Sequence, residues 1–436
     1  MPIQKIKARQ IFDSRGDPTL EVDLITDIGL LRSSVPCTLT PNPNEAVELR
    51  DGNEAAYNGR SVFKAVDMVN NIIGPEIIKT KFDVCQQQEI DNLMIKLDGT
   101  ENKSKLGANA ILAVSTACCK AGAAKRGLPL YKYIAELADN GELYIPVPAF
   151  NVISGGKAAP NPLPCQEFMI MPTGAESFAD AMKMGTEVYR TIEKSIAEQQ
   201  DTKTPLSVND EGAFVPELED DKEVLNLINE AIKATGYDGK IKIALDMAAT
   251  SFCKDGQYDM AFKTEDSDPD DYLEAEALKD QYVEYLTEFP IIVSIEDPFD
   301  QEDWDGWPML SNQPIQIVAD DLTAMNIERV QEAIERRSAN CLLIRLSQAG
   351  TITEAINCHK IAKISGWSSM VTAGYGETED TFVADLAVGL SVKQFKAGAP
   401  CRSERNAKYN QILRIEEEMG KDAKYAGNNF RNPLSK

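Results

Sequence analysis

Three carboxylates end short apolar segments of the sequence. Asp246 ends the segment 241–246, Glu296 ends 291–296 and Asp320 ends 315–320. A lone acid in such a place would be assigned to a helix cap or a salt bridge. Three brought together at low dielectric would repel one another strongly, and a divalent cation relieves that repulsion. Ligation by oxygen alone favours Mg²⁺, so the pattern predicts a magnesium site made of these three residues.

Other residues could also take part in catalysis or metal binding, but each of them alone is weak evidence for such a role. Glu211 lies in a turn-rich loop, where it is placed to act as an acid or base or to bind a metal-bound water. Glu167 begins a predicted strand and is expected to point into the same opening. Asp321 opens Asp-Leu-Thr before a helical pattern, so it is interpreted as a structural cap. His359 is the single histidine, which excludes a histidine-rich metal site, and we expect it on a helix surface or half buried.

The second part of the chain must position these residues. Its apolar segments predict strands at 165–171, 241–246, 291–296, 315–320, 340–345 and 369–372. Between them lie helical patterns at 177–199, 222–235 and 326–337. Alternation of this kind predicts a parallel sheet closed into a barrel, whose strands end at the active face. Polar residues that end separate strands therefore converge there, and Arg345 is one of them.

The first part of the chain has a different pattern. Strand-like segments at 3–12 and 20–25 come before helical patterns at 61–73 and 107–126. We therefore expect an α/β protein with an N-terminal α+β cap domain over residues 1–140. An eight-stranded β/α barrel domain is expected over residues 141–436.

Composition excludes several classes of function. The 436 residues carry a formal net charge of −24, which disfavours nucleic acid and anionic membranes as partners. The sequence shows no signal-peptide core and no apolar run long enough to span a membrane. The nine cysteines form no C-x-x-C pair. We therefore expect free thiols and a cytoplasmic protein.

Longer motifs carry a resemblance to a known family. They are Phe12-Asp-Ser-Arg-Gly-Asp-Pro-Thr, Leu97-Asp-Gly-Thr-Glu-Asn-Lys-Ser-Lys-Leu-Gly-Ala-Asn-Ala-Ile-Leu, Ser294-Ile-Glu-Asp-Pro-Phe-Asp-Gln, Ala319-Asp-Asp-Leu-Thr, Gly376-Glu-Thr-Glu-Asp-Thr-Phe and Gly398-Ala-Pro-Cys-Arg-Ser-Glu-Arg. On these motifs the chain resembles enolase over essentially its whole length. The resemblance implies a cap domain on a modified eight-stranded barrel, usually in a homodimer. It also implies Mg²⁺ and the interconversion of 2-phosphoglycerate and phosphoenolpyruvate.

The resemblance implies roles for individual residues. The ligands of the family's first metal match Asp246, Glu296 and Asp320. The glutamates of the acid side match Glu211 and Glu167. The lysine that meets the substrate carboxylate matches Lys396 in Gln394-Phe-Lys-Ala-Gly-Ala. Four residues that match the family's subunit boundary imply charge pairs there: Arg9, Glu21, Glu404 and Arg414.

The position of the family's catalytic base does not match. Family members carry lysine in Leu-Leu-Lys-Val-Asn-Gln, whereas this chain reads Leu343-Ile-Arg-Leu-Ser-Gln, with Arg345. A lysine can become neutral and accept a proton, but a guanidinium has a pKa above about 12 and stays charged. Arg345 is therefore expected to hold an anion and to be a very poor base.

The phosphate-binding positions differ as well. Where the family has Ser-His-Arg-Ser, this chain has Thr372-Ala-Gly-Tyr, which puts Gly374 at the arginine and Tyr375 at a serine. Ala158 stands at the position of a loop histidine. Thr40 stands at the serine that binds the second metal and still offers a hydroxyl, which makes it a doubtful ligand. Proline at 41 and 43 stiffens what is a mobile lid in the family.

These departures predict an enolase-family protein with impaired or lost catalysis. The alternative is an active or slow phosphopyruvate hydratase, with Lys157 or Arg345 supplying positive charge to the phosphate. A small phosphorylated carboxylate is the expected ligand in either case. The expected partner is a second copy of the chain or, in a heterodimer, an active enolase.

Overall fold

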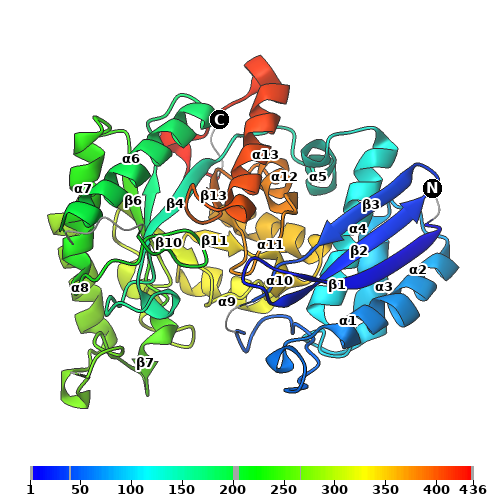
Figure 1. Cartoon of the computed structure of the whole chain (residues 1–436), viewed down its shortest axis with the longest axis horizontal. Coiled ribbons are helices and arrows are strands. Elements are labelled where there is room, and N and C mark those ends of the chain that lie inside the picture. The colour runs from blue at the N-terminus through cyan, green and yellow to red at the C-terminus, as the bar shows by residue number, and fades with distance from the viewer. Residues whose placement is uncertain (1–2, 39–40, 200–205, 266, 434–436) are drawn as a thin grey trace.

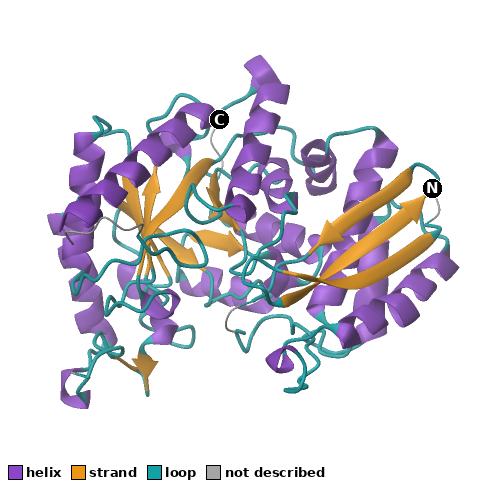
Figure 2. Ribbon diagram, in the orientation of Figure 1, coloured by secondary structure: helices purple, strands orange, loops and turns teal. Residues whose placement is uncertain are grey.

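A small antiparallel sheet opens the chain and a closed barrel follows it, as Figure 1 and Figure 2 show. This computed structural model describes residues 3–38, 41–199, 206–265 and 267–433. The first sheet has the strand order β1-β2-β3. Its strands are β1 (Lys5–Phe12), β2 (Pro18–Thr26) and β3 (Gly29–Ser34).

Helices follow this sheet along the chain and pack either against its strands or against one another. They are α1 (Phe63–Met68), α2 (Gly74–Thr80), α3 (Gln87–Asp98), α4 (Ala108–Arg126) and α5 (Leu130–Ala138). The predicted helix at 61–73 is divided, because a π-helical turn over Val69–Ile73 separates α1 from α2. Helix α4 is buried along most of its length, since its alanines and Gly122 leave room for close neighbours. A Cβ at Gly122 would lie 2.4 Å from the Tyr133 hydroxyl.

The barrel closes in the order β10-β11-β12-β13-β4-β5-β6-β9. Its strands are β4 (Val147–Ser154), β5 (Glu167–Met171), β6 (Lys242–Asp246), β9 (Ile292–Glu296), β10 (Gln316–Ala319), β11 (Cys341–Ile344), β12 (Ser368–Thr372) and β13 (Gln394–Lys396). A separate hairpin is formed by β7 (Cys253–Lys254) and β8 (Gln257–Tyr258). The α/β fold class, with a cap followed by an eight-stranded barrel, is thereby confirmed.

Helices surround the barrel, as Figure 2 shows. They are α6 (Phe178–Gln199), α7 (Asp221–Ala234), α8 (Ala275–Glu288), α9 (Ile327–Arg336), α10 (Leu346–Ala349), α11 (Ile352–Ile364), α12 (Phe382–Gly389) and α13 (Ser403–Met419). Within the described ranges, no helix combines the length and apolar character that crossing a membrane requires.

One barrel strand runs against the others, so the prediction of a wholly parallel sheet is wrong for β5. It pairs antiparallel with β4 and with β6. The 155–166 connection between β4 and β5 contains no crossover helix, which a parallel pair would need. The first residue of β5 therefore lies at the barrel end where the parallel strands finish.

The structure also tests two smaller predictions, one for His359 and one for the cysteines. His359 lies on α11 but is buried rather than at the surface, and its Nδ1 is 3.0 Å from the Ser369 hydroxyl. Burial lowers the pKa of His359 to about 3, so it stays neutral at physiological pH. The cysteines are free thiols, as predicted.

Candidate active site

Lys396 is the cation around which three buried carboxylates gather. Its Nζ lies 2.9 Å from Glu296 Oε1 and 3.1 Å from both Glu167 Oε2 and Asp246 Oδ2. Strand pairing explains the arrangement. Glu167 stands opposite Asp246 on β5 and β6, and Asp246 stands beside Glu296 on β6 and β9. The antiparallel β5 thus delivers Glu167 to the same barrel end as the predicted metal ligands.

Burial sets the protonation of this group. Burial disfavours the charged form of Lys396. The nearby carboxylates outweigh this effect and raise the pKa of the Lys396 amine well above its usual value. Burial also raises the pKa of Glu296, with repulsion from Asp246 as the next cause. Glu296 Oε2 is buried and has no hydrogen-bond partner among the described residues. A free carboxylate oxygen beside Asp246 fits an Mg²⁺ site built from oxygen donors.

Asp320, the third predicted ligand, follows β10 and is held by two side chains. Its Oδ2 accepts a hydrogen bond of 2.6 Å from Arg345 Nη2, and its Oδ1 accepts one of 3.1 Å from Gln348 Nε2. Arg345 also donates to the Ala373 carbonyl. Burial opposes the charge of Arg345, but Asp320 raises the pKa of the guanidinium well above its usual value. A metal ion would therefore compete with a permanent cation for Asp320.

A second acidic group adjoins the first. Carboxylate oxygens of Asp297, Asp320 and Asp321 lie within 4.8 Å of one another. Asp297 accepts the backbone N–H groups of Asp320 and Asp321, at 3.0 and 2.9 Å, and so holds this turn. Asp297 was missed from the sequence, although it directly follows the predicted ligand Glu296.

Asp321 does not cap a helix, so that prediction is wrong. The next helix, α9, has Asn326 as its N-cap, and Asp321 instead lines the cavity and accepts from the Asn42 amide. Burial, together with repulsion from Asp320, raises the pKa of Asp321 to about 7. Asp321 lies too far along the chain from the start of α9 to cap that helix, and the local sequence pattern did not reveal this.

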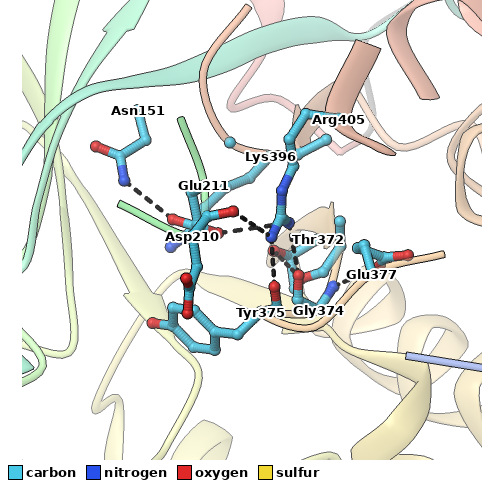
Figure 3. A network of polar contacts seen from close by, with 12 residues as sticks. Asn151, Asp210, Glu211, Thr372, Gly374, Tyr375, Glu377, Lys396 and Arg405 are labelled. Carbon is cyan, nitrogen blue, oxygen red and sulfur yellow. Dashed lines mark hydrogen bonds and ion pairs between the residues drawn. The ribbon is translucent and has the colours of Figure 1, made fainter. Parts of the chain in front are cut away.

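Glu211 faces the Lys396 group from the loop before α7, as Figure 3 shows. Its Oε2 accepts from Asn151 Nδ2 at 3.0 Å, and Arg405 Nη1 lies 3.8 Å from its Oε1. Burial favours the neutral form of Glu211, but Arg405, Lys396 and these hydrogen bonds together lower its pKa. The pKa of Glu167 is raised instead, by burial and then by the charge of Glu211. Glu167 thus has a raised pKa and Glu211 a lowered one, as a general acid and its ionised partner require.

Arg405 was not predicted and holds two loops of the site together. It is fully buried on α13 and donates to the carbonyl groups of Gly374, Tyr375 and Asp210, as Figure 3 shows. The bond to Gly374 is 2.6 Å and the bond to Asp210 is 3.2 Å. One guanidinium thus fixes both the segment after β12 and the loop that carries Glu211. In the sequence Arg405 stood only as the last residue of the motif that begins at Gly398, with no role assigned to it.

The substituted segment after β12 is closed by its own contacts. The Gly374 N–H donates to Glu377 Oε1 at 2.7 Å, and the Tyr375 hydroxyl accepts from Gln166 Nε2 at 2.7 Å. The Arg345 guanidinium lies 5.7 Å from the centre of the Tyr375 ring. These hydrogen-bonding groups are therefore already engaged within the chain, and the phenol occupies space beside Arg345.

Replacing Gly374 with arginine is expected to destabilise the protein by about 1–3 kcal/mol, because a Cβ there would lie 2.7 Å from Pro36 Cβ. Urea unfolding measures the change. Gly374→Ala should cost part of it, and Pro36→Gly, which removes the Cβ in the contact, should relieve the clash in the Gly374→Arg chain. A Gly374→Arg chain as stable as the native one would show that the structure around Pro36 adjusts to the larger side chain at no cost in stability.

Ala158 lies in a short 3₁₀ turn, Gly156–Ala158, at the rim of the site. Lys263 Nζ donates to the carbonyl groups of Gly156 at 2.6 Å and Ala159 at 2.8 Å, which anchors the turn. Lys157 is exposed on the same turn and lines the cavity. Thr40, the doubtful second-metal ligand, lies outside the described residues.

Part of this site lines a cavity of about 150 Å³, to whose lining Glu167, Glu211, Glu296 and Lys396 do not contribute. Its ionisable lining consists of Glu45, Lys157, Asp246, Asp297, Asp320, Asp321 and Arg345, together with Cys37 and Tyr375. Burial raises the pKa of Glu45 to about 8. Acids outnumber basic groups in this lining, so the cavity favours cations.

Two family descriptions match the chain. "Enolase, N-terminal domain" matches residues 3–134, and "Enolase, C-terminal TIM barrel domain" matches residues 142–434. Together they cover both the small sheet with its helices and the closed barrel that carries the acidic site. On this evidence the chain belongs to the enolase family.

Proposed function

We propose that this enolase-family protein binds a divalent cation and a small phosphorylated carboxylate but has lost nearly all 2-phosphoglycerate dehydratase activity. The carrying observation is the ion pair of 2.6 Å between Arg345 and Asp320. The reaction requires a base that removes a proton from the carbon beside the substrate carboxylate. A guanidinium held charged by a buried acid cannot accept that proton.

The family's metal chemistry has its donors in this chain. Asp246, Glu296 and Asp320 would hold Mg²⁺, which would stabilise negative charge on a substrate carboxylate. Lys396 is the residue proposed to meet that carboxylate. Glu211 and Glu167, with pKa values shifted in opposite directions, are proposed to handle the proton on the leaving hydroxyl.

The expected size of the defect is large. Loss of one catalytic base or one bidentate phosphate contact costs several kcal/mol, roughly a hundredfold in rate for each group. The losses at Arg345, Gly374, Tyr375 and Ala158 fall in one site and need not add. The full rate penalty of even one of these substitutions would put turnover far below ordinary enzyme rates.

The test is a coupled assay for phosphoenolpyruvate formation by the pure chain with saturating Mg²⁺ and 2-phosphoglycerate. An active enolase, assayed alongside, establishes that the coupling system works. We expect the chain to turn over at least about a thousandfold more slowly than the control. Turnover at an ordinary enzyme rate would refute the proposal.

A slow but active enolase is the second candidate. Two features favour it: the Lys396 group and the Glu167–Glu211 pair are intact, and Lys157 lines the cavity. Turnover that falls on Lys157→Met would support this candidate, whereas the main proposal expects no change. Lys424→Met is the matched control, because Lys424 pairs with Glu142 outside the cavity lining.

Quaternary structure, location and domain limits are also proposals. We propose a homodimer, with a heterodimer containing an active enolase as the alternative, in the cytoplasm. Within one chain Arg9 already pairs with Glu21, while Glu404 accepts from Arg402 at 2.6 Å. Light scattering at micromolar protein distinguishes dimer from monomer. We place the domain boundary between residues 140 and 141.

A further inference from the structure

Tyr375 borders both the cavity and the buried group around Lys396. Its side chain lines the cavity, where the Arg345 guanidinium lies 5.7 Å from the centre of the ring. Its hydroxyl also lies near the buried acids: burial, followed by the charges of Glu167 and Glu211, raises the pKa of that hydroxyl well above its usual value. The phenol thus stands where the cavity meets the Lys396 group.

The hydrogen bond between Gln166 and Tyr375 crosses the end of the barrel. Gln166 directly precedes β5 and Tyr375 follows β12, and Gln166 Nε2 donates to the Tyr375 hydroxyl at 2.7 Å. In the barrel order, β13 and β4 lie between β12 and β5. Lys396 is the last residue of β13. The bond therefore bridges the barrel mouth beside the strand end that carries Lys396.

The group behind this bridge is closed. The side chains of Lys396, Glu167 and Glu296 are 3%, 1% and 1% exposed, and none of the three lines the cavity. A ligand in the cavity therefore cannot contact Lys396 while Tyr375 keeps this position.

The backbones on both sides of the bridge are fixed by other bonds. Arg405 donates to the Tyr375 carbonyl, and the Gln166 N–H donates to the Asp246 carbonyl at 2.9 Å. The Tyr375 side chain is held by less, namely the bond from Gln166 and the contact with Arg345. Opening the bridge thus requires only that the phenol rotates, at the cost of one neutral hydrogen bond and one ring contact.

We propose that Tyr375, held by Gln166, is a gate that closes the Lys396 group and must swing aside before a ligand carboxylate can reach Lys396. The inference rests on the proposed function, because it concerns access to the same ligand site. A ligand that binds only the open form has its apparent affinity reduced in proportion to the fraction of molecules that are open. The gate therefore weakens ligand binding without touching the bound ligand.

Isothermal titration calorimetry with 2-phosphoglycerate, at saturating Mg²⁺, tests the gate. Tyr375→Ala should raise the affinity of the full chain at least about tenfold, because every molecule is then open. Alanine offers no side-chain hydrogen bond, so the gain cannot come from a new polar contact with the ligand. Tyr144→Ala is the matched control and should leave the affinity unchanged, because Tyr144 also faces a cation, Lys393, but lies outside the cavity lining.

Tyr375→Phe and Gln166→Leu test the hydrogen bond from its two sides while keeping the side-chain volume. Each should raise the affinity about twofold to tenfold, and the double variant should gain no more than either one alone. These variants decide the question if circular dichroism shows that Tyr375→Ala does not fold. An unchanged affinity in them would then overturn the inference.

The outcomes separate the gate from the proposed function. Equal, measurable affinities of the native chain and Tyr375→Ala would overturn the gate and leave the proposed function standing. No binding by either chain would overturn both the gate and the proposed ligand. Turnover of 2-phosphoglycerate at an ordinary enzyme rate by the native chain would refute the proposed function alone.

Discussion

Replacing Lys396 with methionine is expected to lower the free energy of unfolding by about 3–5 kcal/mol at pH 7. The substitution keeps the length of the side chain but removes the cation that three buried carboxylates share at 2.9–3.1 Å. Urea unfolding in the presence of a chelator measures the loss. Added Mg²⁺ should recover part of it, because a bound cation replaces the missing charge and stabilises the folded state.

Lys424→Met is the control for this prediction. Lys424 also pairs with a carboxylate, Glu142, but at the exposed surface, where an ion pair contributes little. Its removal should leave the unfolding curve almost unchanged. If Lys396→Met were equally mild, the three acids would not depend on the lysine and the electrostatic account of the site would fail.

Arg405→Met is the second change with a large expected effect, also about 3–5 kcal/mol. It would remove the hydrogen-bond donors of three carbonyl groups, of which that of Gly374 is buried, and the charge that faces Glu211. Urea unfolding measures the cost. Hydrogen exchange should rise together in 209–212 and 374–377, because one side chain holds both segments.

Arg402→Met is the matched control, since Arg402 lies three residues away and its side chain is partly exposed. It should cost clearly less and leave exchange in 374–377 unchanged. Arg405→Lys keeps the charge and should recover part of the lost stability. Fast exchange in only one of the two segments after Arg405→Met would contradict the claim that Arg405 joins them.

The strand ends of the barrel could be predicted because they follow local rules. Apolar segments that end in Asp246 and Glu296 became β6 and β9, with bounds shifted by one residue at the start. The predicted strand at 315–320 became Gln316–Ala319, which leaves Asp320 just beyond it. Convergence of these ends is a property of barrels, so the acidic group followed from the pattern.

The contacts between distant segments could not be predicted in this way. Nothing local to Arg405 shows that its donors reach Asp210 and Gly374, which lie far away along the chain. The direction of β5 was missed for a similar reason, since strand patterns carry no orientation. Glu167 was nevertheless expected in the opening, and the antiparallel direction explains how the first residue of a strand arrives there.

The packing around Gly374 disfavours the arginine that the family carries at this position. Gly374 leaves no room for a Cβ beside Pro36, and its N–H is taken by Glu377. Sequence comparison identifies the substitution at 374 but not its dependence on residue 36. Restoring the family's residues one at a time therefore meets steric resistance that the sequence does not reveal.

The most direct measurement of the central claim is proton exchange at the substrate carbon beside the carboxylate. The chain is incubated with Mg²⁺ and 2-phosphoglycerate in D₂O, and the carbon-bound proton is followed by nuclear magnetic resonance. Because Arg345 stays charged, the account predicts no exchange above that seen without protein. Rapid loss of the proton signal, catalysed by the native chain, would contradict it.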